Sequence, residues 1–383
     1  MCMYFPHSTM SNTTKILAFS SCLALFLVGC SLTEKETIKI GLITPLTGDV
    51  ASIGTDVLQG AQLMLDEINS AGGINGIPVK LIVEDGRCTG ADAASAAQKL
   101  INVDKVVAIH GAGCSGESMA VAPIAEAAGV VMISGVSTSP DITNAGDFIF
   151  RTAPSDALKT AAMAQYFSEQ GFKKVAMITE NTDFCEGFRA ALKEKAAEGT
   201  SYVFDEVVEP GTKDYRTLIA RLENMDFDVF VANVQTPPTG AAMLQQLREQ
   251  GLEQLVISHD VMDSSITIEL TGDASEGFQV INVPTIADES EFGMKFLAKY
   301  GEPQSNITWG AFGYDTLGVL AEAIATVGTE GTAIRDYFYG LDTYHAVIGD
   351  ISFDENGDVV GIAYALREVK DGAFVKIADI AVE

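Results

Sequence analysis

Residues 38–83 read IKIGLITPLTGDVASIGTDVLQGAQLMLDEINSAGGINGIPVKLIV, and this stretch decides the fold class. The run at 38–43 is short and apolar, which is typical of a buried strand. Over 54–71 the apolar residues keep a helical spacing, and the glycine pair that follows is a helix stop signal. A second apolar run lies at 79–83. The stretch therefore predicts a strand, a helix and a strand, the parts of a βαβ unit.

The same alternation continues along most of the chain. Apolar runs at 105–109 and 130–133 are separated by a helical pattern. A second series of strands and helices runs from 174 to 258 and includes a helix expected over 215–224. Two longer helical patterns follow residue 284, and short strands are expected from 347 onward. This spacing predicts an α/β fold with two doubly wound lobes, each built on a parallel sheet. Ligands of such sheets bind beyond the carboxyl ends of the strands, so the loops at those ends are the candidate site.

Composition restricts the possible partners. The chain has 383 residues, 47% of them hydrophobic and 20% charged, which predicts a packed globular protein of about two to three domains. Lys and Arg number 24 against 52 Asp and Glu, so the formal net charge is -28. A chain this acidic is repelled by phosphate groups, and we expect no nucleic acid partner.

The N-terminal region predicts export. Residues 15–30 read KILAFSSCLALFLVGC, one positive charge before a short apolar run. About 20 apolar residues are needed to span a bilayer, so this layout is that of a secretion signal. The ending Leu27-Val28-Gly29-Cys30 resembles the bacterial lipobox, in which the cysteine becomes the acylated first residue. We expect a lipoprotein signal peptide over 1–29, starting at Met1 or Met10, and lipidation at Cys30; the alternative is a plain signal peptide.

Three further cysteines lie beyond the signal region. Cys88 and Cys114 each follow a predicted strand in neighbouring βα units, a placement compatible with a disulfide in an exported protein. Cys185 has no evident partner and is expected to be a free thiol. The cysteines and the four histidines show no metal-ligand spacing, so we expect no metal site and no cofactor.

Several loop motifs share their order and spacing with one known family. They are P-L-T-G at 45–48, D-E-I-N at 66–69, A-G-G-I-N-G at 71–76, C-S at 114–115, S-T-S-P at 137–140, F-R-T at 150–152 and Y-D at 314–315. From about residue 38 to 361 the chain resembles the type I periplasmic solute-binding proteins, specifically the leucine/isoleucine/valine-binding receptors of ABC transporters. The resemblance implies a receptor without enzymatic activity.

The resemblance also implies a type I periplasmic-binding-protein fold, with two lobes joined by three crossover strands and closing on a ligand in the cleft between them. It places an N-terminal lobe at 38–156 plus 284–360 and a C-terminal lobe at 157–283 plus 361–383. Cys88 and Cys114 match the disulfide of the family's first lobe. The implied partners are a small amino acid ligand and the permease subunits of an ABC importer. A monomer is expected in the periplasm or at the cell surface, in contact with the membrane only through its lipid anchor.

The resemblance carries over to residues that bind the main-chain groups of an α-amino acid. Ser115 matches the serine that bonds the α-carboxylate. Thr138 matches the threonine that bonds the carboxylate and the ammonium group, helped by a backbone carbonyl near Val136. Asp260 falls where the family places an acid that pairs with the ammonium group. The residues alone leave open that Ser115 is only an N-cap, Thr138 a turn residue and Asp260 a solvated loop acid.

The side-chain end of the predicted site departs from the family pattern. Phe184 matches a cleft tyrosine but lacks its hydroxyl, and Trp309 falls at an aromatic position near the third crossover. Ile53 stands where some members have a tryptophan, and Thr236 lies in a stretch that often carries tyrosine. Phe184 and Trp309 are also compatible with ordinary packing. The pattern predicts a branched-chain or other aliphatic α-amino acid, and leaves an amide or an amino-acid analogue open.

Rival functions have weaker support. Residues 111–116 match G-x-G-x-x-G, but this match lies in the third βα unit, and the next strand ends without an acid for a ribose. No G-x-S-x-G motif indicates a hydrolase. The same fold also serves as a ligand-sensing domain, which is the alternative to transport.

Overall fold

The computed structural model describes residues 1–4 and 36–380, and its compact part begins at Ile38. Cys30 and nearly all of the predicted signal peptide lie outside the described residues, so cleavage and lipidation stay predictions. Among the described helices none is by itself long and apolar enough to cross a membrane. Only Ile307–Val327 and Gly331–Tyr339 together meet those criteria, as a pair bent by 111°.

The first lobe is built on a five-stranded parallel sheet with the order β2-β1-β3-β4-β5. Its strands are β1 (Ile38–Thr44), β2 (Val79–Asp85), β3 (Ala108–His110), β4 (Val131–Ser134) and β5 (Ile149–Arg151). The helices between them are α2 (Ala51–Ser70), α3 (Gly90–Lys99) and α4 (Ser115–Ala128). The predicted βαβ pattern at 38–83 is confirmed, although α2 begins three residues before the predicted start at 54.

The second lobe is built on a seven-stranded sheet with the order β15-β14-β10-β9-β8-β6-β7. Its parallel strands are β6 (Lys174–Glu180), β7 (Ser201–Val208), β8 (Val229–Asn233), β9 (Leu255–His259) and β10 (Gln279–Asn282). The connecting helices are α5 (Asp156–Gln170), α6 (Asp183–Lys195), α7 (Arg216–Ile219), α8 (Pro237–Glu249) and α9 (Ser265–Thr271). Two antiparallel strands, β14 (Tyr364–Lys370) and β15 (Ala373–Ile380), complete the sheet.

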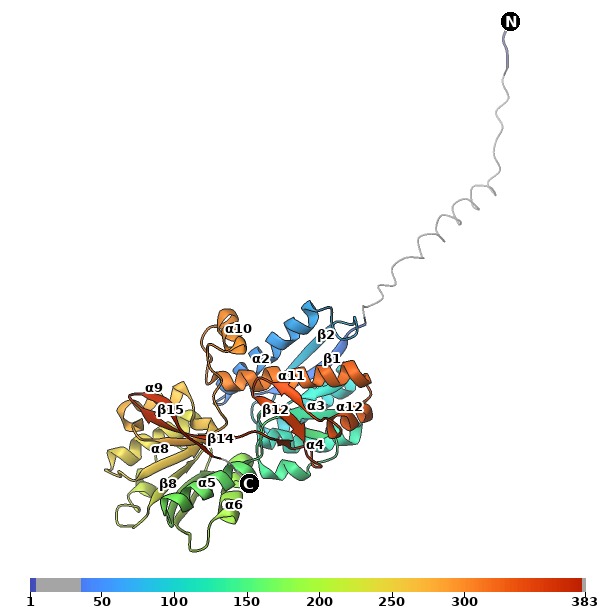
Figure 1. Cartoon of the computed structure of the whole chain (residues 1–383). Coiled ribbons are helices and arrows are strands. Elements are labelled where there is room, and N and C mark those ends of the chain that lie inside the picture. The colour runs from blue at the N-terminus through green and yellow to red at the C-terminus, as the bar shows by residue number, and fades with distance from the viewer. Residues whose placement is uncertain (5–35, 381–383) are drawn as a thin grey trace. The chain divides into compact units, whose positions relative to one another are not determined.

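The chain passes between the two lobes three times, as expected. It leaves the first sheet after β5 and enters α5, and it leaves the second sheet after β10. It then forms α10 (Glu291–Tyr300), α11 (Ile307–Val327) and α12 (Gly331–Tyr339), followed by the small antiparallel sheet of β11 (Tyr344–Ala346), β12 (Gly349–Phe353) and β13 (Val359–Val360). The third passage runs from β13 to β14, and Figure 1 shows β14 and β15 beside the strands of the second lobe.

Side chains alternate between the two faces of each sheet, and helices cover both faces. In β1, Ile40 and Leu42 pack with residues of α2 and α11, whereas Ile43 packs with residues of α3 and α4. In β6, Met177 packs with residues of α5 and α6, and Ile178 packs with residues of α8. This is the doubly wound arrangement predicted from the alternation of strands and helices.

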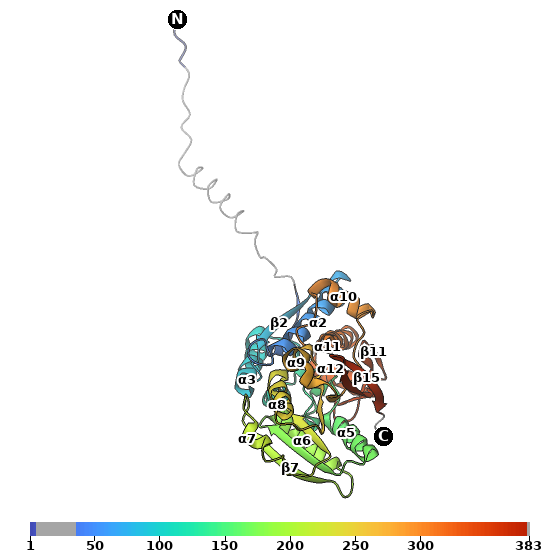
Figure 2. The ribbon, with the colours of Figure 1, turned by 90° about the vertical axis from the view of Figure 1, so that its left-hand side faces the viewer.

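Helices α2 and α11 lie against each other in both views of the ribbon (Figures 1 and 2). Glycines make this close approach possible, because a Cβ atom at Gly60 would overlap the carbonyl oxygen of Gly310. The contact anchors α11, which follows the second passage, to the first lobe.

Candidate ligand-binding site

Loops from both lobes line a small inner cavity of about 30 Å³. The first lobe contributes the loop after β1, the start of α4 and the loop after β4, and the second contributes the start of α6 and the loops after β8 and β9. The lining residues are Pro45, Val50, Ile53, Gly113, Cys114, Ser115, Val136, Thr138, Phe184, Gln235, Asp260, Val261 and Trp309. Of the eight predicted ligand residues, all but Thr236 are in this set.

Ser115 is the first residue of α4, and the N-cap of the helix is Cys114. The interpretation of Ser115 as only an N-cap is therefore wrong. Ser115 is 2% exposed, and its Oγ accepts a hydrogen bond from the backbone N–H of Ser139 at 3.2 Å. The N–H groups of a first helical turn have no acceptor within the helix and carry partial positive charge. With a buried hydroxyl beside them, these N–H groups can bind a carboxylate.

Glu117 and a disulfide fix the start of α4. The buried carboxylate of Glu117 accepts backbone N–H groups of Cys88 at 2.7 Å, Gly113 at 2.9 Å and Cys114 at 3.0 Å. Cys88 and Cys114 form the disulfide that the family resemblance implied. Burial raises the pKa of Glu117 to about 7, against the opposing effect of its three backbone hydrogen bonds. The hydrogen bonds of Glu117 and the disulfide together fix the position of Ser115.

Thr138 is joined to the start of α5. Its hydroxyl donates to Oδ2 of Asp156 at 2.8 Å, and the backbone N–H of Asp156 donates to the carbonyl of Thr138, also at 2.8 Å. The hydroxyl hydrogen of Thr138 is thus engaged within the protein. The oxygen of that hydroxyl remains able to accept a hydrogen bond from a ligand.

Asp260 is buried and paired with a lysine that the sequence analysis did not single out. The Nζ atom of Lys159 lies 2.9 Å from Oδ2 of Asp260 and 2.7 Å from Oδ1 of Asp156. Asp260 is 6% exposed, so the interpretation of this acid as a solvated loop residue is wrong. Although burial opposes ionisation, Lys159 and His259 hold the pKa of Asp260 well below its usual range.

The same two carboxylates act on Lys159. Burial disfavours the charge of Lys159, but Asp156 and Asp260 outweigh it and raise the pKa of the ammonium group. Burial also raises the pKa of Asp156, which the charge of Lys159 counteracts. The only sequence signal for Lys159 is its spacing of three from Asp156, which places both on one face of the first turn of α5.

Two aromatic side chains line the inner cavity. The rings of Trp309 and Phe312 on α11 lie 6.2 Å apart, and the ring of Phe184 meets the ring of His259 edge-on at 4.9 Å. Trp309 and Phe184 are each 5% exposed and line the cavity together with Ile53. These side chains add apolar surface to a cavity that Ser115 and Asp260 also line.

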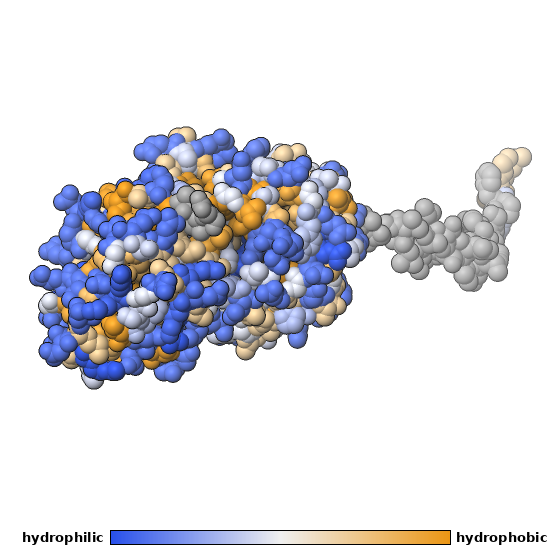
Figure 3. All heavy atoms as spheres, turned by 60° about the horizontal axis from the view of Figure 1, so that its bottom comes forward, coloured by the Kyte–Doolittle hydropathy of each residue, from blue (hydrophilic) through white to orange (hydrophobic). Residues whose placement is uncertain are grey.

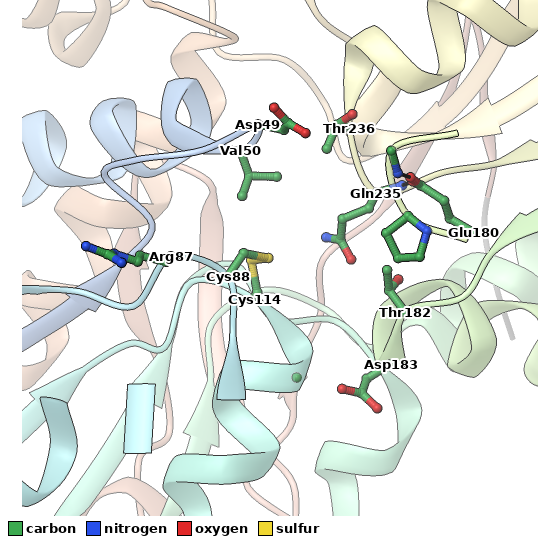
Figure 4. A pocket seen from close by; sticks show the side chains of 13 residues that line it. Asp49, Val50, Arg87, Cys88, Cys114, Glu180, Thr182, Asp183, Gln235 and Thr236 are labelled. Atoms are coloured by element: carbon green, nitrogen blue, oxygen red, sulfur yellow. Dashed lines mark hydrogen bonds between the residues drawn. A yellow bond between two sulfur atoms is a disulfide. The ribbon is translucent and has the colours of Figure 1, made fainter. Parts of the chain in front are cut away.

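A wider outer cavity of about 360 Å³ adjoins the inner one, and Val50, Cys114 and Gln235 line both. Figure 4 shows the disulfide and Val50 on one wall of the outer cavity and Gln235 and Thr182 on the other. Thr236 lies here instead of in the inner cavity, and its hydroxyl caps α8 by accepting the N–H of Thr239 at 3.3 Å. Four charged residues line the outer cavity: Asp49, Arg87, Glu180 and Asp183.

The described residues contain no group of three or more His, Cys, Asp or Glu side chains that is arranged to hold a metal ion.

Comparison with known proteins identifies relatives of this chain. A model of the family described as periplasmic binding protein matches residues 37–373. Over 340 residues the chain is 27% identical to the leucine-, isoleucine-, valine-, threonine-, and alanine-binding protein of Pseudomonas aeruginosa, covering 87% of this chain and 90% of that protein.

Solved structures agree with the sequence comparison. The branched-chain amino acid transporter substrate binding protein LivJ of Streptococcus pneumoniae, in complex with isoleucine, is 27% identical, with a TM-score of 0.80 over 89% of this chain and 100% of that one. The leucine binding protein LivK of Thermotoga maritima is 28% identical, with a TM-score of 0.80 over 90% of this chain and 98% of that one. The arrangement of two lobes and three passages described above is thus shared with proteins that match along nearly their whole length.

Proposed function

The chain belongs to the periplasmic binding protein family and is a solute-binding receptor, and from this premise we propose that its solute is an aliphatic α-amino acid bound in the inner cavity. The observation that carries the proposal is that two unlike polar groups line that cavity, one from each lobe. Ser115 stands at the start of a helix in the first lobe, and Asp260 lies at the end of a strand in the second. A solute with a carboxylate and a hydrogen-bonding group on its α-carbon can connect the two.

In the proposed complex, the carboxylate of the solute binds the hydroxyl of Ser115 and the free N–H groups at the start of α4. Thr138 and the carbonyl of Val136 lie beside the α-carbon, and Asp260 lies beyond them. The apolar side chain contacts Phe184, a favourable contact because apolar surface leaves water. The relative from Pseudomonas aeruginosa is named for leucine, isoleucine, valine, threonine and alanine, LivJ is in complex with isoleucine, and LivK is named for leucine, which supports an aliphatic side chain.

The position of the inner cavity supports a hinged mechanism. Residues of both lobes line it, so the two lobes enclose a solute that is bound there. The lobes must therefore separate to admit the solute and close again around it, with the three passages as hinges. Closure follows only if the solute binds the closed state more tightly than the open state.

The receptor is exported in this proposal, with residues 1–29 removed and Cys30 acylated. It acts as a monomer with lobes at 38–156 plus 284–360 and 157–283 plus 361–383, and it delivers its solute to an ABC permease. On the face shown in Figure 3, hydrophilic residues cover most of the described surface, which supports an aqueous compartment. Labelling with palmitate tests the anchor, because the Cys30→Ser variant should lose the label that the unchanged chain carries.

Calorimetry with the twenty amino acids tests the solute class. We expect heat of binding from at least one aliphatic amino acid, and identification of a co-purified solute by mass spectrometry gives an independent answer. No binding across the whole panel would contradict the proposed amino acid.

A further inference from the structure

Four charged or titratable side chains meet at the Asp260 end of the inner cavity, and we call Asp156, Lys159, His259 and Asp260 the Lys159 cluster. All four are buried, and Lys159 is 1% exposed although it is a lysine. Lysine is almost never buried without a partner, and here its ammonium group lies between two carboxylates at 2.7 and 2.9 Å. The acid that faces the solute therefore already has a cation of the protein's own.

The hydrogen bonds around His259 place its hydrogens. The side-chain amide of Asn233 donates to the carbonyl of Cys185 at 2.7 Å, so its oxygen is the atom that faces Nε2 of His259 at 3.2 Å. Nε2 must then carry a hydrogen, and Nδ1 faces Oδ1 of Asp260 at 3.3 Å.

The ion pair with Lys159 changes what Asp260 requires of a solute. A buried carboxylate that relies on the ammonium group of a ligand is left unpaired when the ligand lacks that group, which is strongly unfavourable. Lys159 keeps Asp260 paired whether or not an ammonium group is present. An ammonium group placed beside Asp260 also meets the like charge of Lys159, which weakens its attraction.

The ammonium group of Lys159 also has one N–H bond that neither carboxylate accepts. An ammonium group has three N–H bonds, and two of them serve Asp156 and Asp260. No third acceptor for Nζ is found within residues 36–380. Lys159 lines a narrow void of about 10 Å³ next to the inner cavity, and Thr138, Asp260 and Trp309 line both. The remaining N–H suits an uncharged oxygen on the α-carbon of a solute.

We propose that Lys159 determines the specificity of the cleft, so that it accepts small carboxylates with a hydroxyl or carbonyl oxygen on the α-carbon, the 2-hydroxy and 2-oxo acids, alongside α-amino acids. This inference rests on the proposed function in one respect: the inner cavity is the solute site. In the proposed complex Ser115 and α4 bind the carboxylate, and Lys159 donates a hydrogen bond to the α-oxygen.

The unchanged protein provides the first test. Calorimetry compares leucine, isoleucine and valine with the 2-hydroxy and 2-oxo acids of the same carbon skeletons. We expect at least one skeleton for which the 2-hydroxy or 2-oxo acid binds within tenfold of the amino acid, or more tightly. A preference for the amino acid above 100-fold in every pair overturns the role of Lys159 and leaves the proposed function standing. If no member of any pair binds, this inference fails, and the proposed function fails with it when none of the twenty amino acids binds either.

The variant Lys159→Met tests the residue itself, because methionine has a similar length and no charge. Asp260 then lacks its internal cation, and we expect the preference for the amino acid over its 2-hydroxy counterpart to rise at least 100-fold. Lys295→Met is the matched control, since Lys295 pairs with Glu67 at 2.9 Å outside the cavity and should leave the preference unchanged. An unchanged preference in Lys159→Met overturns the proposal, and if that variant does not fold, the comparison in the unchanged protein decides.

Discussion

The contribution of the Ser115 hydroxyl to solute binding can be measured by removing its single oxygen atom. The change Ser115→Ala removes the hydroxyl but leaves the N–H groups at the start of α4 in place. A hydrogen bond to a charged group contributes about 1.5–3 kcal/mol, so we expect the affinity for the solute to fall about 10- to 100-fold. Isothermal titration of the unchanged and variant proteins with one aliphatic amino acid measures the difference.

Ser118→Ala is the control for this variant, because Ser118 lies on the same helix and does not line the inner cavity. Its Oγ lies 2.7 Å from the Oγ of Ser137, so its loss should lower thermal stability and leave the affinity unchanged. Equal affinities in Ser115→Ala and the unchanged protein would remove Ser115 from the proposed site.

At the residue scale, the sequence predicted which side chains meet but not how they are paired. Ser115 and Asp260 follow parallel strands, and the carboxyl ends of such strands meet at one edge of a sheet, so their approach was predictable. Lys159 follows no strand, because it lies on the first turn of α5 beyond the first passage. Its contact with Asp260 depends on the angle at which α5 leaves that passage, which no local pattern encodes.

Helix α4 depends on a carboxyl group whose proton affinity is altered by burial. Glu117 binds three backbone N–H groups, and its pKa of about 7 lies above the ordinary value of 4.5. The folded state therefore retains a proton that the unfolded state loses, and this contribution to stability is lost as the pH rises from about 4.5 to about 7. We expect the free energy of unfolding of the unchanged protein to fall, relative to that of Glu117→Gln, by up to about 3 kcal/mol over this range.

Urea unfolding of both proteins at pH 5 and pH 8 measures this effect, because the difference between them cancels contributions from other buried acids. Asp56 and Asp315, whose pKa values burial raises to about 6 and about 7, are present in both proteins. A difference in unfolding free energy that is constant between the two pH values would contradict the raised pKa of Glu117.

For the helices, the spacing of hydrophobic residues predicted which side chains are buried better than it predicted the backbone hydrogen-bond pattern. A helix was predicted over 215–224, and the apolar residues Tyr215, Ile219 and Leu222 are buried as that helix requires. Yet α7 ends at Ile219, and the chain continues in turns in which the N–H of Leu222 donates to the carbonyl of Ile219. A three-residue turn and a helix bury nearly the same positions, so the spacing cannot separate them. Helices α5 and α12 were not predicted.

The two lobes meet through the faces of α4 and α6 on either side of the cleft. Glycines lie at the tightest points: a Cβ atom at Gly116 on α4 would overlap the carboxylate of Asp183 on α6. A Cβ atom at Gly187 on α6 would lie 2.5 Å from Oγ of Ser139 and 3.2 Å from Cδ of Pro140. Because glycine has no Cβ atom, these positions leave the space that the lobes need in order to close. The hydrophobic core of each lobe lies away from this contact.

A bulky residue at Gly187 should therefore act on the closed state of the whole molecule. We expect Gly187→Leu to weaken solute binding at least tenfold, because the apparent affinity falls with the fraction of molecules that can close. The melting temperature without solute should change little, since the leucine faces water when the lobes are apart. Small-angle scattering with saturating solute should give a larger radius of gyration for Gly187→Leu than for the unchanged protein. Ala190→Leu, an exposed position on the same helix, is the control and should bind and close normally. Normal affinity and compaction in Gly187→Leu would mean that the solute binds without the lobe contact seen at α4 and α6.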